Sequence, residues 1–210
     1  SYFVKTKSGK WGMIAYGNEI HSIMIGYKRG RFTGTIGVSG WCDDNPDKWE
    51  NLQTLPYWNE KAYEKANPDM FSLQKNWAKK HIKEEHRIKD SMVTTMSANK
   101  YNEKQSRAMS AHIDSGDYPE GLSTMAVFKD GDYSGAYLTF PQYGVAVDIP
   151  DNTCALFDSQ VMHGVTPIRG EGTRYSITAY TDTRLATIGA AGKSERPIGH
   201  HNIDKRGCLE

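Results

Sequence analysis

The second half of this chain is dominated by short apolar segments separated by turn signals. Segments 122–129, 133–140 and 173–180 are rich in β-branched and aromatic residues, and Asp, Asn, Gly and Pro are frequent between them. Strands of roughly four to eight residues with turns at this spacing are typical of a β-sandwich or barrel. We therefore predict a mainly β fold with flanking helices.

At 210 residues, the chain has the length of one generous domain. We predict N-terminal β-hairpins, a loop and supporting helices over 1–100, a core over 101–183 and an extension over 184–210. Within the first part, residues 10–38 alternate as three short strands, which we expect to extend one sheet.

A helix is predicted over residues 59–90, where apolar side chains recur near one face. Asn67 followed by Pro68 is a helix start signal, because Asn caps the free N–H groups and Pro fits the first helical position. Residues 39–58 are expected to form a loop that carries three tryptophans. These rings either contact substrate or attach the loop to the core, and the sequence favours neither alternative.

Composition narrows the function classes. A formal net charge of +1 argues against a protein that coats nucleic acid, although it permits a local basic face. The three cysteines lack Cys-x-x-Cys spacing, which argues against a zinc site or a disulfide framework. Since we find no signal peptide and no long apolar run, we expect an intracellular protein, nuclear or cytoplasmic, without a membrane span. The chain begins with Ser rather than Met, so we expect natural flanking segments.

Three residues in the β-rich half have the pattern of a metal site. His112 and Asp114 are two positions apart, and alternate residues of a strand point to the same face. A second imidazole, His163, follows and precedes a glycine that leaves room for a ligand. Two imidazoles and one carboxylate form the facial triad of non-haem Fe(II) oxygenases. We therefore predict that these three residues are catalytic and bind iron.

Arg174 and Ser176 are also two positions apart, at the start of the last alternating segment. On one face of a strand they are suited to hold a carboxylate, because a planar guanidinium offers two parallel donors. Arg169 is a competing candidate, but it lies in a predicted turn over 168–172. We therefore predict that Arg174 and Ser176 together hold a carboxylate.

Residues 110–181 resemble the Fe(II)/2-oxoglutarate-dependent dioxygenases, whose core is a double-stranded β-helix or jelly-roll. The resembling motifs are His112-Ile-Asp114, Gly135-Ala-Tyr-Leu-Thr-Phe-Pro141, Ala155-Leu-Phe-Asp158, His163-Gly164 and Arg174-Tyr-Ser176. Their order is most similar to the TET/JBP nucleobase oxygenases, particularly compact fungal or phage-like members. The usual Gly-Gly is Gly135-Ala136 here, and the Cys-rich region of the animal enzymes has no counterpart.

The resemblance implies Fe(II), 2-oxoglutarate and O2 as cofactors, and Arg174 and Ser176 as ligands of the distal carboxylate of 2-oxoglutarate. It implies a methylated base in DNA, of the 5-methylcytosine or thymine type, as substrate. The tryptophan-rich loop would then contact nucleic acid, together with Lys28, Arg29 and Arg31. Two alternatives stay open: the same chemistry on a protein side chain or small metabolite, and a jelly-roll that binds metal without catalysis.

Overall fold

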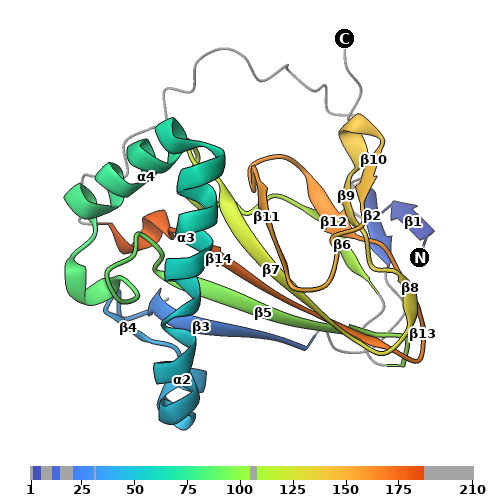
Figure 1. The fold of residues 1–210 in the computed structure, drawn as a ribbon, viewed down its shortest axis with the longest axis horizontal. Coiled ribbons are helices and arrows are strands. Elements are labelled where there is room, and N and C mark those ends of the chain that lie inside the picture. The colour runs from blue at the N-terminus through green and yellow to red at the C-terminus, as the bar shows by residue number, and fades with distance from the viewer. Residues whose placement is uncertain (1, 6–10, 15–20, 31, 105–107, 187–210) are drawn as a thin grey trace.

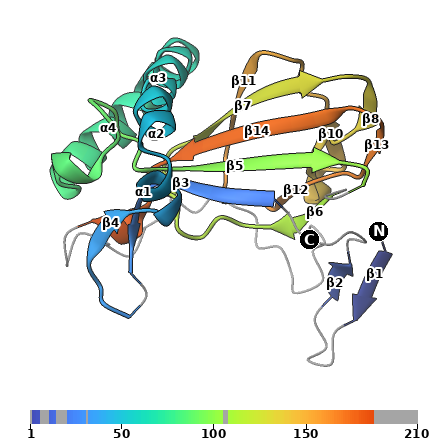
Figure 2. The ribbon, with the colours of Figure 1, turned by 90° about the horizontal axis from the view of Figure 1, so that it is seen from below.

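The computed structural model describes residues 2–5, 11–14, 21–30, 32–104 and 108–186. Two antiparallel β-sheets form the core, and the helices gather at one end and over the outer face of the larger sheet (Figures 1 and 2). The mainly β jelly-roll predicted from the sequence is confirmed. The predicted extension from residue 187 onward lies outside the described residues.

The larger sheet has the strand order β11-β7-β14-β5-β3-β4. Its strands are β3 (His21–Arg29), β4 (Ile36–Val38), β5 (Thr95–Asn102), β7 (Ser123–Asp130), β11 (Thr153–Phe157) and β14 (Thr173–Tyr180). The smaller sheet, β10-β9-β12-β6, comprises β6 (Met109–His112), β9 (Leu138–Phe140), β10 (Val145–Val147) and β12 (His163–Val165). Two further pairs are β1 (Tyr2–Lys5) with β2 (Trp11–Ile14) and β8 (Tyr133–Gly135) with β13 (Ile168–Gly170).

Helices occupy the segment predicted to be a loop. The α-helices are α1 (Gly40–Asp44), α2 (Pro46–Leu52), α3 (Leu55–Ala66) and α4 (Pro68–His81), and 3-10 turns are η1 (Glu84–His86), η2 (Pro141–Tyr143) and η3 (Thr183–Leu185). The prediction of a loop over 39–58 is therefore wrong. In place of the single helix predicted over 59–90, the structure has α3 and α4, and α4 ends at His81. The start signal is confirmed, since the Asn67 side chain accepts a hydrogen bond from the Met70 N–H at 3.2 Å.

Tryptophans of the helical segment pack on the outer face of the larger sheet. Trp41 and Trp49 contact a buried cluster that includes Ile25 of β3 and Met96 of β5. The strand pleat turns alternate residues to opposite faces, so the inner face of the same strands is free to carry polar groups. Burial of these rings therefore holds the helices against the sheet and away from the space between the two sheets.

Two strand predictions need correction. Of the three strands expected over 10–38, β3 and β4 extend the larger sheet, whereas β2 pairs with β1. The single strand expected over 133–140 is broken after Gly135, where Gly135 and Ala136 have φ of 80° and 55°. Left-handed backbone interrupts a β ladder, and a side chain on Gly135 would collide with the Pro167 carbonyl oxygen.

Arg29, which fits a solvated turn or, with DNA as substrate, a contact to nucleic acid, hydrogen-bonds to backbone in this structure. Its guanidinium donates to three carbonyl oxygens, those of Arg184 at 2.6 Å, Gly34 at 2.7 Å and Ala186 at 3.2 Å. It therefore ties β3 to the segment that follows β14. Arg31 lies outside the described residues, and the Lys28 side chain is exposed.

We expect Arg29→Ala to lower the free energy of unfolding by about 1–3 kcal/mol, because three carbonyl groups lose a charged donor. Urea denaturation measures this loss. Lys28→Ala is the matched control, and it should leave stability unchanged. Unchanged stability of Arg29→Ala with weaker DNA binding would restore the original prediction.

Candidate metal centre

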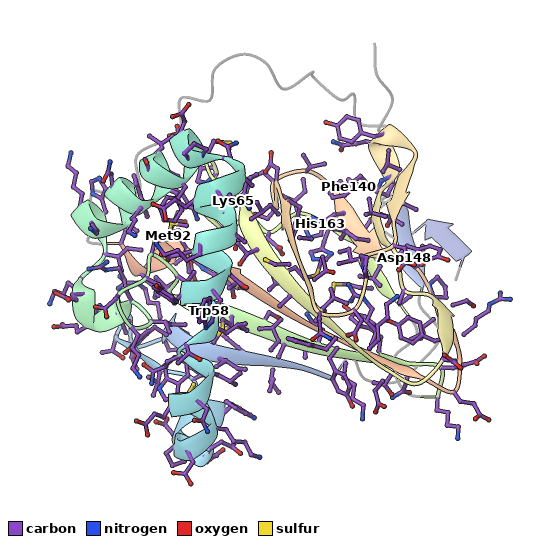
Figure 3. The ribbon with its side chains drawn as sticks, in the orientation of Figure 1. Trp58, Lys65, Met92, Phe140, Asp148 and His163 are labelled. Atoms are coloured by element: carbon purple, nitrogen blue, oxygen red, sulfur yellow. The ribbon has the colours of Figure 1, made fainter. Side chains whose placement is uncertain are left out.

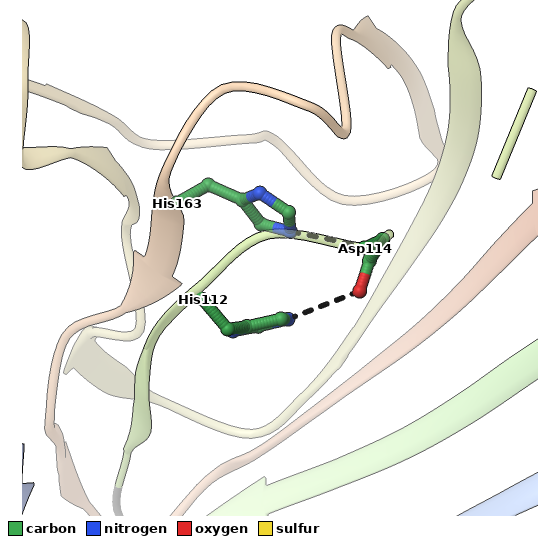
Figure 4. Close-up of side chains that lie close together, drawn as sticks. All are labelled: His112, Asp114 and His163. Carbon is green, nitrogen blue, oxygen red and sulfur yellow. Dashed lines mark ion pairs between the residues drawn. The ribbon is translucent and has the colours of Figure 1, made fainter. Parts of the chain in front are cut away.

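The three predicted metal ligands converge at one point between the sheets (Figure 4). His112 ends β6 and His163 begins β12, and the two residues are antiparallel partners. Asp114 follows β6. Its Oδ1 lies 3.4 Å from Nε2 of His112, and its Oδ2 lies 3.4 Å from Nε2 of His163. Strand pairing thereby joins two histidines that are 51 residues apart, and Asp114, two residues after His112, supplies the carboxylate.

Backbone carbonyls fix the tautomer of both imidazoles. The Nδ1–H of His112 donates to the Ser110 carbonyl oxygen, and that of His163 donates to the Val161 carbonyl oxygen, each at 2.8 Å. In a neutral imidazole whose Nδ1 carries the proton, Nε2 is the free lone pair. Both Nε2 atoms are therefore prepared to bind a metal, and the groups that orient them are part of the main chain.

Asp114 provides the negative charge of the site. Although burial alone raises a carboxyl pKa, hydrogen bonds and charge from the two imidazoles hold the pKa of Asp114 well below its usual range. In return, a hydrogen bond to the Asp114 carboxylate raises the pKa of His112. The main chain of Asp114 is fixed as well, because its N–H donates to the Ser159 carbonyl oxygen and its carbonyl accepts from Gln160 Nε2.

This donor set fits a divalent transition metal. Bonds of about 2.1 Å to one ion place two neighbouring ligand atoms roughly 3.0–3.4 Å apart, and the observed separations are 3.4 Å. All three ligand atoms lie within 4.8 Å of one another. Two imidazoles with one carboxylate and further open positions suit non-haem Fe(II). The separations of the ligand atoms are therefore consistent with the iron site that the residue types predicted.

A cavity of about 290 Å³ opens beside the three side chains. The exposed fractions of the His112 and Asp114 side chains are 35% and 33%, whereas that of His163 is 6%. The ring of Phe157 packs against His163 with centroids 5.0 Å apart. One side of the metal centre is thus sealed by apolar packing, and the opposite side faces the cavity.

The inner face of the larger sheet forms a polar wall of this cavity. The pairing of β5 with β14 aligns Ser97 with Thr178, Asn99 with Ser176, and Tyr101 with Arg174. All of these except Arg174 line the cavity. The wall therefore runs as a ladder of hydroxyl and amide groups toward a buried guanidinium at one end.

Comparison with known proteins identifies the family. The family model Tet_JBP, the oxygenase domain of the 2OGFeDO superfamily, matches residues 42–183. The chain belongs to this family. The prediction of a TET/JBP-type oxygenase is confirmed, and membership of the superfamily implies Fe(II), 2-oxoglutarate and O2 as cofactors, in agreement with the sequence prediction.

Two known proteins are similar to this chain. Thymine dioxygenase JBP1 of Trypanosoma brucei brucei is 26% identical over 128 residues, which cover 61% of this chain and 14% of that protein. The chain thus spans about a seventh of the length of the curated relatives it matches. The structure of NgTET1 in complex with 5mC DNA has a TM-score of 0.63 and 13% identity over 80% of this chain and 63% of that one, and shows a shared fold.

Within the oxygenase domain, Arg174 is buried without a carboxylate partner among the described residues. The exposed fraction of Arg174 is 2%. In the described structure its Nη1 has no hydrogen-bond partner, and its Nη2 donates to the Met125 sulfur at 3.8 Å. A thioether is a weak acceptor on a flexible side chain, and Met125 also lines the cavity. The competing Arg169 is exposed on β13 rather than in a turn.

Sequence reasoning missed several cavity residues. They include Asn99, Asp117, Tyr180 and Arg184. Burial raises the pKa of Asp117 to about 7, and the Ser123 hydroxyl donates to its carboxylate at 2.7 Å. Arg184 is held by two hydrogen bonds to Asp182. Only Asp117 carried a signal, since it follows His112 and Asp114 closely in the chain.

The three tryptophans of residues 39–58 were open to two interpretations, substrate contact or attachment to the core. None of them lines the cavity. Trp41 and Trp49 pack on the outer face of the sheet, while Trp58 is 67% exposed on α3, apart from His163 (Figure 3). The core-packing alternative is therefore correct for Trp41 and Trp49.

No helix in the described segments is both long and apolar enough to cross a membrane.

Proposed function

We propose that this domain is an Fe(II)/2-oxoglutarate-dependent dioxygenase that hydroxylates a methyl group on a base in DNA. His112, Asp114 and His163 hold the iron, and Arg174 and Ser176 hold the distal carboxylate of 2-oxoglutarate. The observation that carries the proposal is a prepared His-Asp-His centre beside a cavity that leads toward an unpaired, buried guanidinium.

When bound, iron with 2-oxoglutarate and O2 supplies an oxidant for C–H bonds and releases succinate and CO2. The chain contributes binding and orientation. The two carbonyl groups that accept from Nδ1 keep each Nε2 unprotonated. Phe157, Leu138 and Val165 line the cavity with apolar surface that limits water near the reacting centre.

Arg174 positions the cosubstrate. A buried guanidinium without an anionic partner is costly, so a carboxylate is stabilised strongly there. The cavity lining includes Tyr101, the strand partner of Arg174, and Ser176, the next residue on the same face of β14. We therefore expect the Met125 side chain to change rotamer, so that Nη2 of Arg174 donates to a carboxylate oxygen instead of to the sulfur.

The DNA substrate rests on the relatives. JBP1 is named a thymine dioxygenase, and NgTET1 was solved with 5mC DNA. The cavity lies between two sheets, and an enzyme of this kind acts on a base that has left the duplex stack. The half-exposed side of the metal centre is where the base would enter. DNA as substrate also implies a compartment that contains DNA, in keeping with the intracellular expectation.

Succinate production from 2-oxoglutarate with Fe(II) tests the proposal. Duplexes that contain 5-methylcytosine, thymine only, or neither methylated base are compared, and digested nucleosides are analysed by mass spectrometry. We expect succinate to rise with one methylated duplex and an oxidised nucleoside to appear. Succinate production that ignores DNA would move the substrate to a protein or metabolite. Bound metal without succinate would leave a non-catalytic module.

A further inference from the structure

Three buried polar atoms around the Arg174 end of the cavity wall have no hydrogen-bond partner within the described structure. They are Asn99 Oδ1, Tyr133 OH and Arg174 NH1. Buried polar groups in native proteins are nearly always paired, because an unpaired one costs its full desolvation energy. Their gathering in one region indicates a ligand that supplies the missing partners. Neither Asn99 nor Tyr133 has a role in the proposed function.

Tyr133 packs on the buried cluster that contains Tyr101, the ring beside Arg174. Tyr133 is on β8 and packs on the cluster that contains Tyr101, Val165 and Ile168. The Arg174 guanidinium carbon is 5.6 Å from the centroid of the Tyr101 ring. Both unpaired groups therefore lie around the cluster that contains Tyr101, a cavity residue, and the charge of Arg174 acts on the Tyr133 hydroxyl.

The Tyr133 hydroxyl is an effective donor at this place. Burial raises its pKa and the Arg174 charge offsets this only in part, so the hydroxyl keeps its proton. The neighbouring Tyr101 hydroxyl is already directed to the Met109 sulfur at 3.8 Å. Of these two tyrosines, Tyr133 is the one whose hydroxyl has no hydrogen-bond partner in the described structure.

We propose that the Tyr133 hydroxyl is a third donor to the distal carboxylate of the cosubstrate, beside Arg174 and Ser176. A carboxylate accepts about four hydrogen bonds, so its two oxygens have room for all three groups. Tyr133 then acts as a positioning residue that selects a 2-oxo dicarboxylate over a 2-oxo monocarboxylate. This inference rests on the proposed function of the site.

The test is Tyr133→Phe, loaded with Mn(II) and free of oxygen, with cosubstrate binding measured by calorimetry. We expect 2-oxoglutarate to bind roughly 10- to 100-fold more weakly, as befits a lost hydrogen bond to a charged group. Binding of 2-oxobutyrate, which lacks the distal carboxylate, should not change. Tyr175→Phe is the matched control, because Tyr175 is adjacent to Arg174 but points to the opposite, exposed face of β14.

Thermal unfolding without cosubstrate separates this role from a structural one. Removal of an unpaired buried hydroxyl should leave Tm unchanged or raise it, whereas a lower Tm would show that the hydroxyl supports the fold and would overturn the inference. Equal weakening of both acids, or unchanged 2-oxoglutarate affinity, would also overturn it. If the unmodified domain itself bound no 2-oxoglutarate, the proposed function would fail as well.

Discussion

Asp114→Ala is expected to abolish turnover and to lower affinity for Fe(II) by roughly 100-fold or more, since loss of even an outer-shell partner costs 10–100-fold. The carboxylate is the single anionic ligand and contacts both Nε2 atoms. Without it, two neutral imidazoles face a divalent cation with no compensating charge. Metal content after gel filtration and succinate production measure the two effects.

Asp43→Ala is the control for Asp114→Ala, because Asp43 is an exposed carboxylate on α1 far along the chain from the metal centre. Its metal content and turnover should equal those of the unmodified domain. Circular dichroism of both variants should show the native fold. Full metal content in Asp114→Ala would mean that the proposed ligand set is incorrect.

Arg174→Met is expected to raise the 2-oxoglutarate concentration needed for half-maximal turnover by roughly 100-fold. The cosubstrate loses its charged partner, and charge-assisted hydrogen bonds are the strong ones. The methionine side chain fills most of the vacated volume, and replacement of a buried charge by an apolar group is often neutral for stability. Steady-state kinetics give the first quantity and thermal unfolding gives the second.

Arg169→Met is the companion variant, since Arg169 is exposed on β13. Its requirement for 2-oxoglutarate should be that of the unmodified domain. If Arg169→Met raised the requirement and Arg174→Met did not, the cosubstrate site would have to be reassigned to the other arginine.

Local pattern was enough to predict the elements that carry the site. The strand expected over 173–180 has those bounds in the structure, because its alternation is strong and Gly172 precedes it. The candidate metal centre was predictable from residue types and spacing, since His112 and Asp114 do converge with His163, although Asp114 lies just beyond the end of β6. The helix start at Pro68 followed from its capping residue.

Short helices and an unusual backbone escaped prediction. Helices α1 and α2 have 5 and 7 residues, which is too short for a 3.6-residue period to emerge. The break after Gly135 depends on a left-handed Ala136, a conformation that alanine seldom adopts and that its presence in a sequence does not announce.

The polar wall depended on strand pairing between distant segments. Asn99 faces the cavity opposite Ser176 because β5 pairs with β14 in one particular register. A shift of one residue would turn every side chain of β5 to the other face. Nothing local to residues 95–102 specifies that register, so Asn99 and Tyr101 were not recognised as cavity residues.

The two carbonyl groups that orient His112 and His163 have a consequence for redesign of the enzyme. Side chains around a metal usually share the task of fixing its ligands, so that a change in pocket shape risks the wrong imidazole nitrogen facing the ion. Here the main chain performs that task, through carbonyl groups two residues before each histidine. Cavity residues such as Ser97, Thr178 and Tyr180 are therefore free to be exchanged for new substrates while the protonation of both ligands is preserved.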